Sequence, residues 1–247
     1  GRLGAAASVV IKSFYFTTAA HSLKAVIDMN AYFFPSRRRR LAIWREEVLG
    51  MPLLRLELPE RPTPRMCRKA ALVCERCGVH QLLSAPEYWP GPDLPPLSST
   101  RALWIQKAPE AALFLLRRRG VAPERAKVEF CADRFTLQAQ RAILDLLPRV
   151  RALSLSLPAP EAFLWRLQRD YGVSPVPGEG DVALCYSPVP RRWALPLWQQ
   201  RPEIEGAGLC CAVPDAPEGC PLPELLAALE EQGRLRAEEI QICSDFA

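Results

Sequence analysis

Histidine and lysine are scarce in this chain of 247 residues. His21 and His80 are the only two histidines, so catalysis by a histidine base or a Ser-His-Asp triad has little material. Only five of the 32 basic residues are lysines, and the other 27 are arginines. Because proline, alanine and leucine are also abundant, the arginine excess is typical of a GC-rich coding sequence and is weak evidence for anion recognition.

Long apolar runs are also lacking. A membrane span needs about 20 uninterrupted apolar residues, and Lys12, Lys24 and Asp28 break the N-terminal stretch. A signal peptide carries its charges before its apolar part, whereas here the arginine run 37–40 follows it. Residues 1–36 are similar to an organellar transit segment, but in composition alone. We therefore predict that residues 1–50 are an N-terminal extension that need not belong to the domain, and we expect no membrane span.

Strand and helix patterns alternate between residues 126 and 187. Three apolar runs, VEFCA, VRALSLSL and DVALCYS, are separated by the amphipathic stretches DRFTLQAQRAILDLL and APEAFLWRLQRDYG. This alternation predicts a βαβαβ unit, which is half of a Rossmann-like fold. The predicted fold class is therefore α/β, with a mostly parallel, doubly wound sheet.

The flanking segments extend this prediction. Residues 51–98 predict a first βαβ unit, whose helix begins at Thr63–Pro64 and ends before Gly78, followed by a Pro-rich segment that is either a linker or an ordered crossing loop. Residues 99–247 predict the Rossmann-like unit, preceded by a helix that Pro109 kinks or splits. An antiparallel C-terminal addition is expected from WALPLW, GAGLCCAVP, the helical PLPELLAALEEQG and the edge strand EEIQICS.

No glycine occurs in the turn after VEFCA. A dinucleotide-binding fold has G-x-G-x-x-G there, and an acid at the end of the next strand. Here the turn reads Ala-Asp-Arg-Phe-Thr over 132–136 and the next strand ends in Leu157–Pro158. Over roughly residues 101–187 the order of elements is similar to the coenzyme domains of shikimate-type and methylenetetrahydrofolate-type dehydrogenases, which implies a dinucleotide site. Because its motif is missing, we expect no cofactor, and we predict that Asp133 caps the following helix.

Nine cysteines are spread over a long chain, and their number is odd. This is unlike a short secreted disulfide scaffold, so we predict a reduced, cytoplasmic protein. Cys74 and Cys77, with His80 close behind, form the most metal-like group. Zinc requires four nitrogen or sulfur ligands, and no second pair lies nearby. We interpret the two cysteines as part of a helix end, and we expect no metal.

Candidate ligand-binding residues follow the predicted strands, because α/β sheets bind ligands beyond the carboxyl ends of their strands. An acid among several arginines suits a small carboxylate or phosphate, although solvated loop charges are the alternative interpretation. The candidates are Glu60, Arg61, Arg65, Asp133, Arg134, Thr136, Arg191 and Arg192, with Glu87, Tyr88 and Glu161 at the same edge.

Three functions remain open from the sequence. The leading hypothesis is a small-ligand-binding or protein-interaction module; a cleft lined by arginine would favour an anionic ligand, and one filled by Phe135 and Trp165 a protein partner. A divergent dehydrogenase or transferase acting on a small anionic substrate through Asp133, Arg134 and Arg191 is the first alternative. Nucleic-acid binding is the second. Residues 1–199 carry a net charge of +12 against −7 for residues 200–247, which allows an anionic partner without requiring one, but no recognised nucleic-acid-binding pattern is present. The arginine run 117–119 is explained by its place at a helix end.

Overall fold

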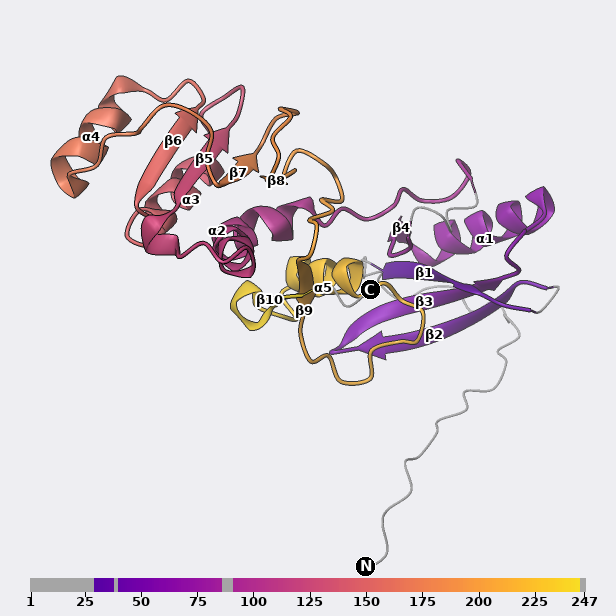
Figure 1. Cartoon of the computed structure of the whole chain (residues 1–247). Coiled ribbons are helices and arrows are strands. Elements are labelled where there is room, and N and C mark those ends of the chain that lie inside the picture. Colours follow the sequence, from indigo (N-terminus) through magenta and orange to yellow (C-terminus); the bar gives the residue numbers. More distant parts are fainter. Residues whose placement is uncertain (1–28, 38–39, 86–90, 245–247) are drawn as a thin grey trace, which may run out of the picture.

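The computed structural model describes residues 29–37, 40–85 and 91–244. Within them the chain is a mixed α/β protein whose two four-stranded, mostly parallel sheets are flanked by helices (Figure 1). No helix among these residues is both long and apolar enough to cross a membrane. Most of the predicted N-terminal extension, together with Glu87 and Tyr88, lies outside the described residues.

The first sheet has the strand order β2-β3-β1-β4. Strands β1, β3 and β4 are parallel, and β2 pairs antiparallel with β3 through a tight turn at Leu49–Gly50. Helix α1 connects β3 to β4; Thr63 caps its start through Met66 N–H and Gly78 (φ 70°) ends it, as predicted. The element bounds are β1 (Met29–Pro35), β2 (Ala42–Val48), β3 (Met51–Leu58), α1 (Pro64–Cys77) and β4 (Val79–Leu82).

Strands β1 and β2 occupy residues that we predicted to be an extension, so that expectation is wrong for residues 29–35 and 42–48. Strand β1 lies between β3 and β4, and its Ala31, Tyr32 and Phe33 are buried. Strand β2 is an edge strand with charged, exposed residues, as edge strands often have. The basic composition around residues 37–40 concealed two short strands whose partners lie further along the chain.

The second sheet is parallel throughout, with the order β6-β5-β7-β8. Its first three strands and two connecting helices confirm the predicted βαβαβ order. Strand β8 pairs parallel with β7, so the antiparallel prediction for WALPLW is wrong; residues 186–193 carry the chain back before β8 begins. The bounds are β5 (Lys127–Cys131), α3 (Leu137–Leu146), β6 (Ala152–Ser156), α4 (Glu161–Tyr171), β7 (Val182–Cys185) and β8 (Ala194–Leu195).

Two helices lie between the sheets, α2 (Arg101–Arg118) and α5 (Leu222–Glu231) (Figure 1). Helix α2 continues through Pro109, so the prediction of two helices is wrong; burial of Ala108, Pro109, Ala111 and Ala112 holds the chain helical despite the missing N–H. Strands β9 (Gly208–Cys210) and β10 (Gln241–Cys243) pair antiparallel as predicted, but as a separate two-stranded sheet. Two 3-10 turns, η2 (Pro123–Arg125) and η3 (Ala237–Glu239), complete the elements of the described residues.

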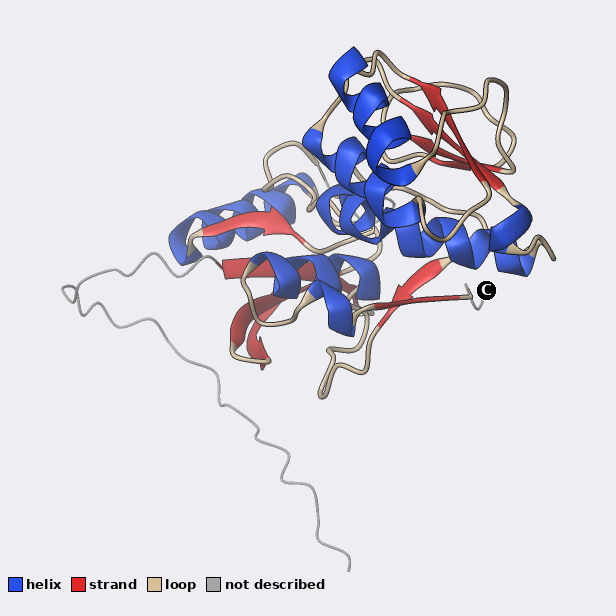
Figure 2. Ribbon diagram, turned by 90° about the vertical axis from the view of Figure 1, so that its left-hand side faces the viewer, coloured by secondary structure: helices blue, strands red, loops and turns tan. Residues whose placement is uncertain are grey.

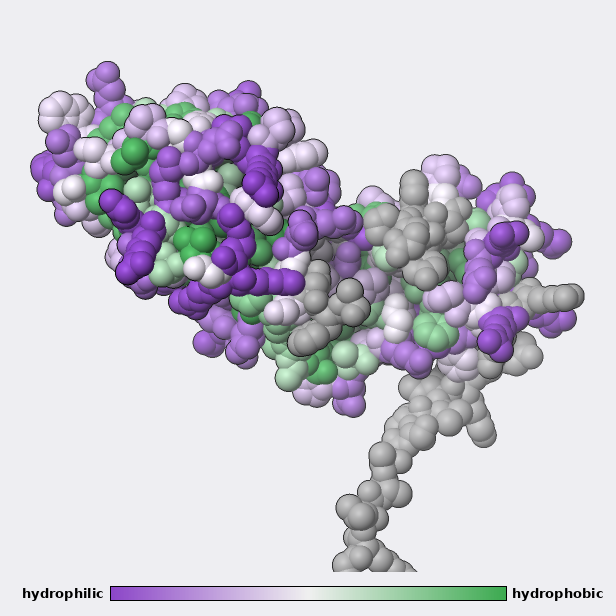
Figure 3. Space-filling view, viewed as in Figure 1, coloured by the Kyte–Doolittle hydropathy of each residue, from purple (hydrophilic) through white to green (hydrophobic). Residues whose placement is uncertain are grey.

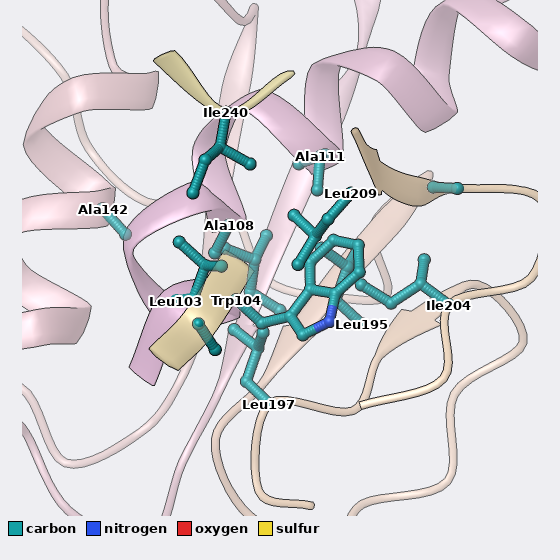
Figure 4. Packing of buried hydrophobic residues seen from close by; sticks show 14 of the residues in the cluster. Leu103, Trp104, Ala108, Ala111, Ala142, Leu195, Leu197, Ile204, Leu209 and Ile240 are labelled. Carbon is teal, nitrogen blue, oxygen red and sulfur yellow. The ribbon is translucent and has the colours of Figure 1, made fainter. Parts of the chain in front are cut away.

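One hydrophobic core joins both sheets. It includes Tyr32 and Met51 of the first sheet, Phe130 and Leu184 of the second, and residues of α2 and α5. Figure 4 shows the Trp104 ring of α2 among Leu195, Leu197, Ile204 and Leu209. The described part of the Pro-rich segment is an ordered crossing, because Leu82 N–H bonds Pro96 O (2.9 Å) and Ser98 N–H bonds Leu82 O (2.8 Å).

The two faces of the second sheet are packed differently. Val128 and Phe130 join the shared core, to which helices α2, α3 and α4 contribute buried residues. Figure 2 shows helices alongside this sheet in the upper part of the view. The alternating residues Cys131, Ala183 and Cys185 point to the opposite face, where Val189 and Ala194 pack against them from the segment after β7.

Candidate functional site

A cleft of about 930 Å³ opens at the carboxyl end of the second sheet. The chain leaves β5 to form β6 on one side and later returns to form β7 on the other, so the strand order reverses at the β5/β7 pair. Open α/β sheets bind ligands at such a reversal, and the volume lies in the range of small-molecule sites. The lining residues are Ser99, Arg101, Ala102, Ile105, Gln106, Ala132, Asp133, Arg134, Thr136, Gln138, Arg141, Tyr186 and Ser187.

Four elements position these side chains. Asp133 and Arg134 follow β5, and Tyr186 and Ser187 follow β7. Tyr186 N–H donates to Cys131 O (2.8 Å), which extends the ladder between the two strands to the edge of the cleft. The first two turns of α3 and α2, with residues just before them, supply most of the remaining side chains. The cleft is thus held on rigid elements, since its residues adjoin strand ends and helix starts.

Helix α3 begins at the cleft and is capped by Thr136. The Thr136 hydroxyl accepts a hydrogen bond from Ala139 N–H (3.2 Å). Our prediction that Asp133 caps this helix is therefore wrong, because the helix begins at Leu137, one residue after Thr136, and Asp133 is exposed. The unpaired N–H groups of a helix start carry partial positive charge and favour an anion.

Helix α2 also begins at the cleft, through Arg101 and Ala102. Thr100 N–H and Arg101 N–H both donate to Gln200 O (3.0 and 3.1 Å), and Arg101 Nε donates to Leu197 O (2.8 Å). These bonds fix the helix start and the Arg101 side chain. Because this start lies at the cleft, the positive end of a second helix dipole lies there too.

The charged residues lining the cleft are mostly cationic. Arg101, Arg134 and Arg141 are opposed by Asp133 alone among the lining residues, which leaves a net charge of +2. A guanidinium presents several N–H donors in a planar fork that matches carboxylate and phosphate oxygens. The cleft is therefore electrostatically suited to a small anion.

Two hydroxyl groups at the cleft are buried without a hydrogen-bond partner among the described residues. These are Tyr186 Oη and Ser187 Oγ. Ser187 is 5% exposed, and burial raises the pKa of Tyr186 above its ordinary value, so its phenol is protonated at neutral pH. An unsatisfied buried hydroxyl costs about 1–3 kcal/mol. Both oxygens are closed off from solvent, so a ligand in the open cleft does not contact them as the side chains stand.

The predicted site residues fall into three groups. Asp133, Arg134 and Thr136 come together at the cleft as expected. Three others, Glu60, Arg61 and Arg65, follow β3 in the first sheet and do not line it. Another three lie near the second sheet but outside the cleft lining, namely Glu161 at the start of α4, Arg191 and Arg192.

Arg191 is instead paired with Glu129 of β5. Its Nε and Nη2 atoms donate to the two carboxylate oxygens at 2.9 Å each, and Ser156 Oγ donates to Oε1 (2.7 Å). The Glu129 side chain is 1% exposed. Burial alone would raise its pKa, but the hydrogen bonds from Arg191 and Ser156 outweigh that effect and lower the pKa to about 2. This pair lies on the sheet face opposite the helices, so the Arg191 guanidinium is bonded within the fold and does not line the cleft.

Sequence reasoning missed the other side chains at the cleft. Tyr186 and Ser187 directly follow a predicted strand, so the rule used for the other candidates could have found them. Gln138 and Arg141 lie three residues apart near the start of α3 and share one helix face. Arg101 and Ile105 gave no signal, because only the tertiary fold places the start of α2 beside the β5 loop.

The cysteines are all free thiols. Cys74 of α1 is buried in the apolar cluster beneath the first sheet, and burial raises its pKa to about 12; His80 is exposed on β4. Cys131 and Cys185 are buried opposite each other on β5 and β7. Throughout the described ranges, no group of three or more His, Cys, Asp or Glu side chains is arranged to hold a metal ion.

Comparison with known proteins adds nothing to this geometry. No protein-family model matches the chain, and no curated protein matches it significantly.

Proposed function

We propose that this chain is a Rossmann-like small-ligand-binding module that takes an anionic ligand in the β5/β7 cleft. The observation that carries the proposal is the convergence of three arginines and two helix starts at the point where the strand order reverses. Each feature alone is common on protein surfaces. Together, in one cleft of ligand size, they supply charge and directed donors.

The cleft is not filled by the aromatic side chains that would have favoured a protein partner. The Phe135 ring packs on Phe163 of α4, with 4.8 Å between ring centroids, and Trp165 is 70% exposed on α4. Neither residue lines the cleft. By our own criterion, arginine lining with the aromatic residues elsewhere favours an anionic ligand over a protein interaction.

The two alternative functions have weaker support. A dehydrogenase or transferase using Asp133, Arg134 and Arg191 loses one of its three residues, because Arg191 pairs with Glu129. Nucleic-acid binding would need free arginines, but Arg118 and Arg119 donate to the carbonyls of Gly206 and Asp181, and Arg119 also stacks on the Trp193 ring (4.0 Å). Arg192 faces the same ring at 5.4 Å.

Calorimetric titration with inorganic phosphate and with citrate tests the proposed function. We expect binding of at least one anion, and a roughly 10- to 100-fold loss of affinity in Arg134→Ala and in Arg141→Ala, since each removes a charge-assisted hydrogen bond. Arg68→Ala is the matched control, because Arg68 is an exposed arginine on α1 far from the cleft lining.

Four results would contradict this proposal. If neither phosphate nor citrate binds, an anionic ligand is rejected. If both arginine variants bind with unchanged affinity, this cleft is rejected as the site. Micromolar affinity for NADH or NADPH, measured by fluorescence, would favour a dehydrogenase instead. Retention on DNA that falls steeply with salt would favour nucleic-acid binding.

A further inference from the structure

We infer that Cys210 and Cys243 form a redox-sensitive pair whose thiols join in a reversible disulfide between β9 and β10. Both are free thiols in the structure. Neither residue lines the β5/β7 cleft, so this site is separate from the proposed function. The inference is argued from the register of the two strands, from the contacts of the two sulfur atoms and from their exposure.

The register of β9 and β10 brings the two cysteines together. The strands are antiparallel, with Cys210 opposite Gln241 and Cys243 opposite Gly208. Because alternate residues of a strand share a face, the cysteines are diagonal neighbours on one face. Gly208 has no side chain, which leaves room for the Cys243 thiol to lie across β9.

The sulfur atoms lie between the two strands. Cys243 Sγ lies 3.5 Å from Gly208 O, and Cys210 Sγ lies 3.7 Å from Gln241 O. The two thiols also form a hydrogen bond with each other. Each sulfur therefore already reaches towards the neighbouring strand, and a bond between them requires no change of face.

The pair lies on the face of this small sheet that is turned away from the core. Leu209 and Ile242, which alternate with the cysteines, pack in the core that joins both sheets. Cys210 and Cys243 are partly exposed. The sheet lies close to α5 in Figure 1, and Figure 3 shows hydrophobic residues reaching the surface in this lower middle part of the view. A dissolved oxidant can therefore reach the thiols.

A second pair of neighbouring cysteines shows why exposure matters. Cys131 and Cys185 lie opposite each other on β5 and β7 and also share a hydrogen bond, but both are fully buried. Thiol–disulfide exchange requires that an oxidant approach one of the sulfur atoms. We therefore expect the pair on β9 and β10 to be oxidised while the buried pair stays reduced.

The oxidant belongs to the class of small-molecule disulfides, of which oxidised glutathione is the probe used below. Burial raises the pKa of the Cys210 thiol to about 11, so Cys243 attacks first. Its thiolate bonds to one glutathione sulfur, the glutathione S–S bond breaks, and one glutathione thiolate leaves. The Cys210 thiolate then attacks Cys243 Sγ and displaces the second glutathione. The two cysteines lose two protons and two electrons, and both pass to the glutathione.

The geometry favours a reducible bond over a permanent one. Diagonal neighbours in a sheet lie about 7–8 Å apart, whereas a relaxed disulfide spans about 4.4–6.8 Å between Cα atoms. Strand β10 therefore shifts slightly when the bond forms. Disulfides that are strained or exposed are more easily reduced than structural ones. The bond also closes the loop 211–242, which contains α5, and loop closure stabilises the folded chain.

The test equilibrates the full chain with mixtures of reduced and oxidised glutathione, alkylates the remaining thiols and maps the disulfide by mass spectrometry. We expect one disulfide, between Cys210 and Cys243, and a melting temperature that rises by about 5–10 °C and falls again with dithiothreitol. Cys210→Ser and Cys243→Ser should abolish the rise, and Cys210→Ser should trap glutathione on Cys243. Cys211→Ser is the matched control, because Cys211 packs against the core instead, and it should behave as wild type.

Several outcomes overturn the inference. They are no disulfide at any glutathione ratio, a disulfide at Cys131 and Cys185, a bond from Cys243 to Cys211 or Cys220, and an unchanged melting temperature after oxidation. Loss of the effect in Cys211→Ser also contradicts it. Each serine variant alone breaks the pair, so one that folds is enough for the test. None of these results changes the expected binding of anions in the β5/β7 cleft, which is tested separately.

Discussion

Glu129 is an ionised side chain inside a parallel sheet, and its charge links folding to pH. Its pKa lies near 2 in the folded protein, against an ordinary value of 4.5. A carboxyl group whose pKa is depressed by folding contributes stability above its unfolded pKa and loses it as the pH falls through the folded pKa. The contribution of Glu129 is therefore complete above about pH 5 and disappears towards pH 2.

Glu129→Gln should remove this contribution and its pH dependence. The variant loses stability because the amide cannot form the charged fork with Arg191. The pKa shift of Glu129 corresponds to about 3 kcal/mol of unfolding free energy at pH 7. At pH 3 the difference between wild type and variant should shrink to about 1 kcal/mol. Urea unfolding at both pH values measures it. Glu203→Gln, at an exposed position, should change stability by less than about 0.5 kcal/mol at either pH; a pH-independent loss in Glu129→Gln would reject the depressed pKa.

Helix α3 is capped by Thr136, three residues after the cap that the sequence predicted. Thr136→Ala should destabilise the protein by about 1 kcal/mol, because Ala139 N–H loses its acceptor. Asp133→Asn is the matched change at the position that the sequence suggested, and we expect an effect below about 0.5 kcal/mol, since Asp133 lies outside the helix. Chemical denaturation of the two variants gives the comparison. A larger loss in Asp133→Asn than in Thr136→Ala would reverse the assignment.

The elements also show what can be predicted from a sequence and what cannot. The bounds of α1 followed from Thr63, Pro64 and Gly78, because caps are local chemistry. Strand β1 was missed because it has no local partner: its neighbours β3 and β4 come later in the chain. For Pro109, the local rule predicted a kink or a split into two helices, but burial on both sides of the proline kept α2 one continuous helix.

The same contrast between local signals and tertiary contacts applies to the candidate site. Asp133, Arg134 and Thr136 were found because they follow a recognisable strand, and the sequence places such residues at one edge of a sheet. Arg191 also follows a strand, yet it turns to Glu129, a partner 62 residues away. Strand ends therefore indicate where a cleft lies, whereas the side chains that enter it depend on tertiary pairing.

At the scale of the whole molecule, Arg201 ties together segments that belong to different sheets. Its Nε donates to Ser98 O (2.9 Å) ahead of α2, its Nη1 contacts Ser84 O beyond β4, and the same Nη1 lies 3.2 Å from the Glu224 carboxylate at the start of α5. The side chains of Arg201 and Glu224 are only 15% and 10% exposed. The guanidinium thus sits where the first sheet, α2 and α5 meet, beside the core that both sheets share.

Arg201→Met should therefore weaken the whole molecule rather than one lobe. The methionine keeps most of the apolar stem but leaves the Glu224 carboxylate and two buried carbonyls without this donor, which costs about 3 kcal/mol. For a chain of this size the melting temperature should fall by roughly 6–12 °C. Arg68→Met on the exposed face of α1 is the control and should shift it by less than about 2 °C.

Hydrogen exchange shows whether Arg201→Met weakens one sheet or both. Because one core joins the sheets, the slowest amides of β3 and β5 should lose protection together. Loss confined to β3 and β4 would mean that the two sheets open independently.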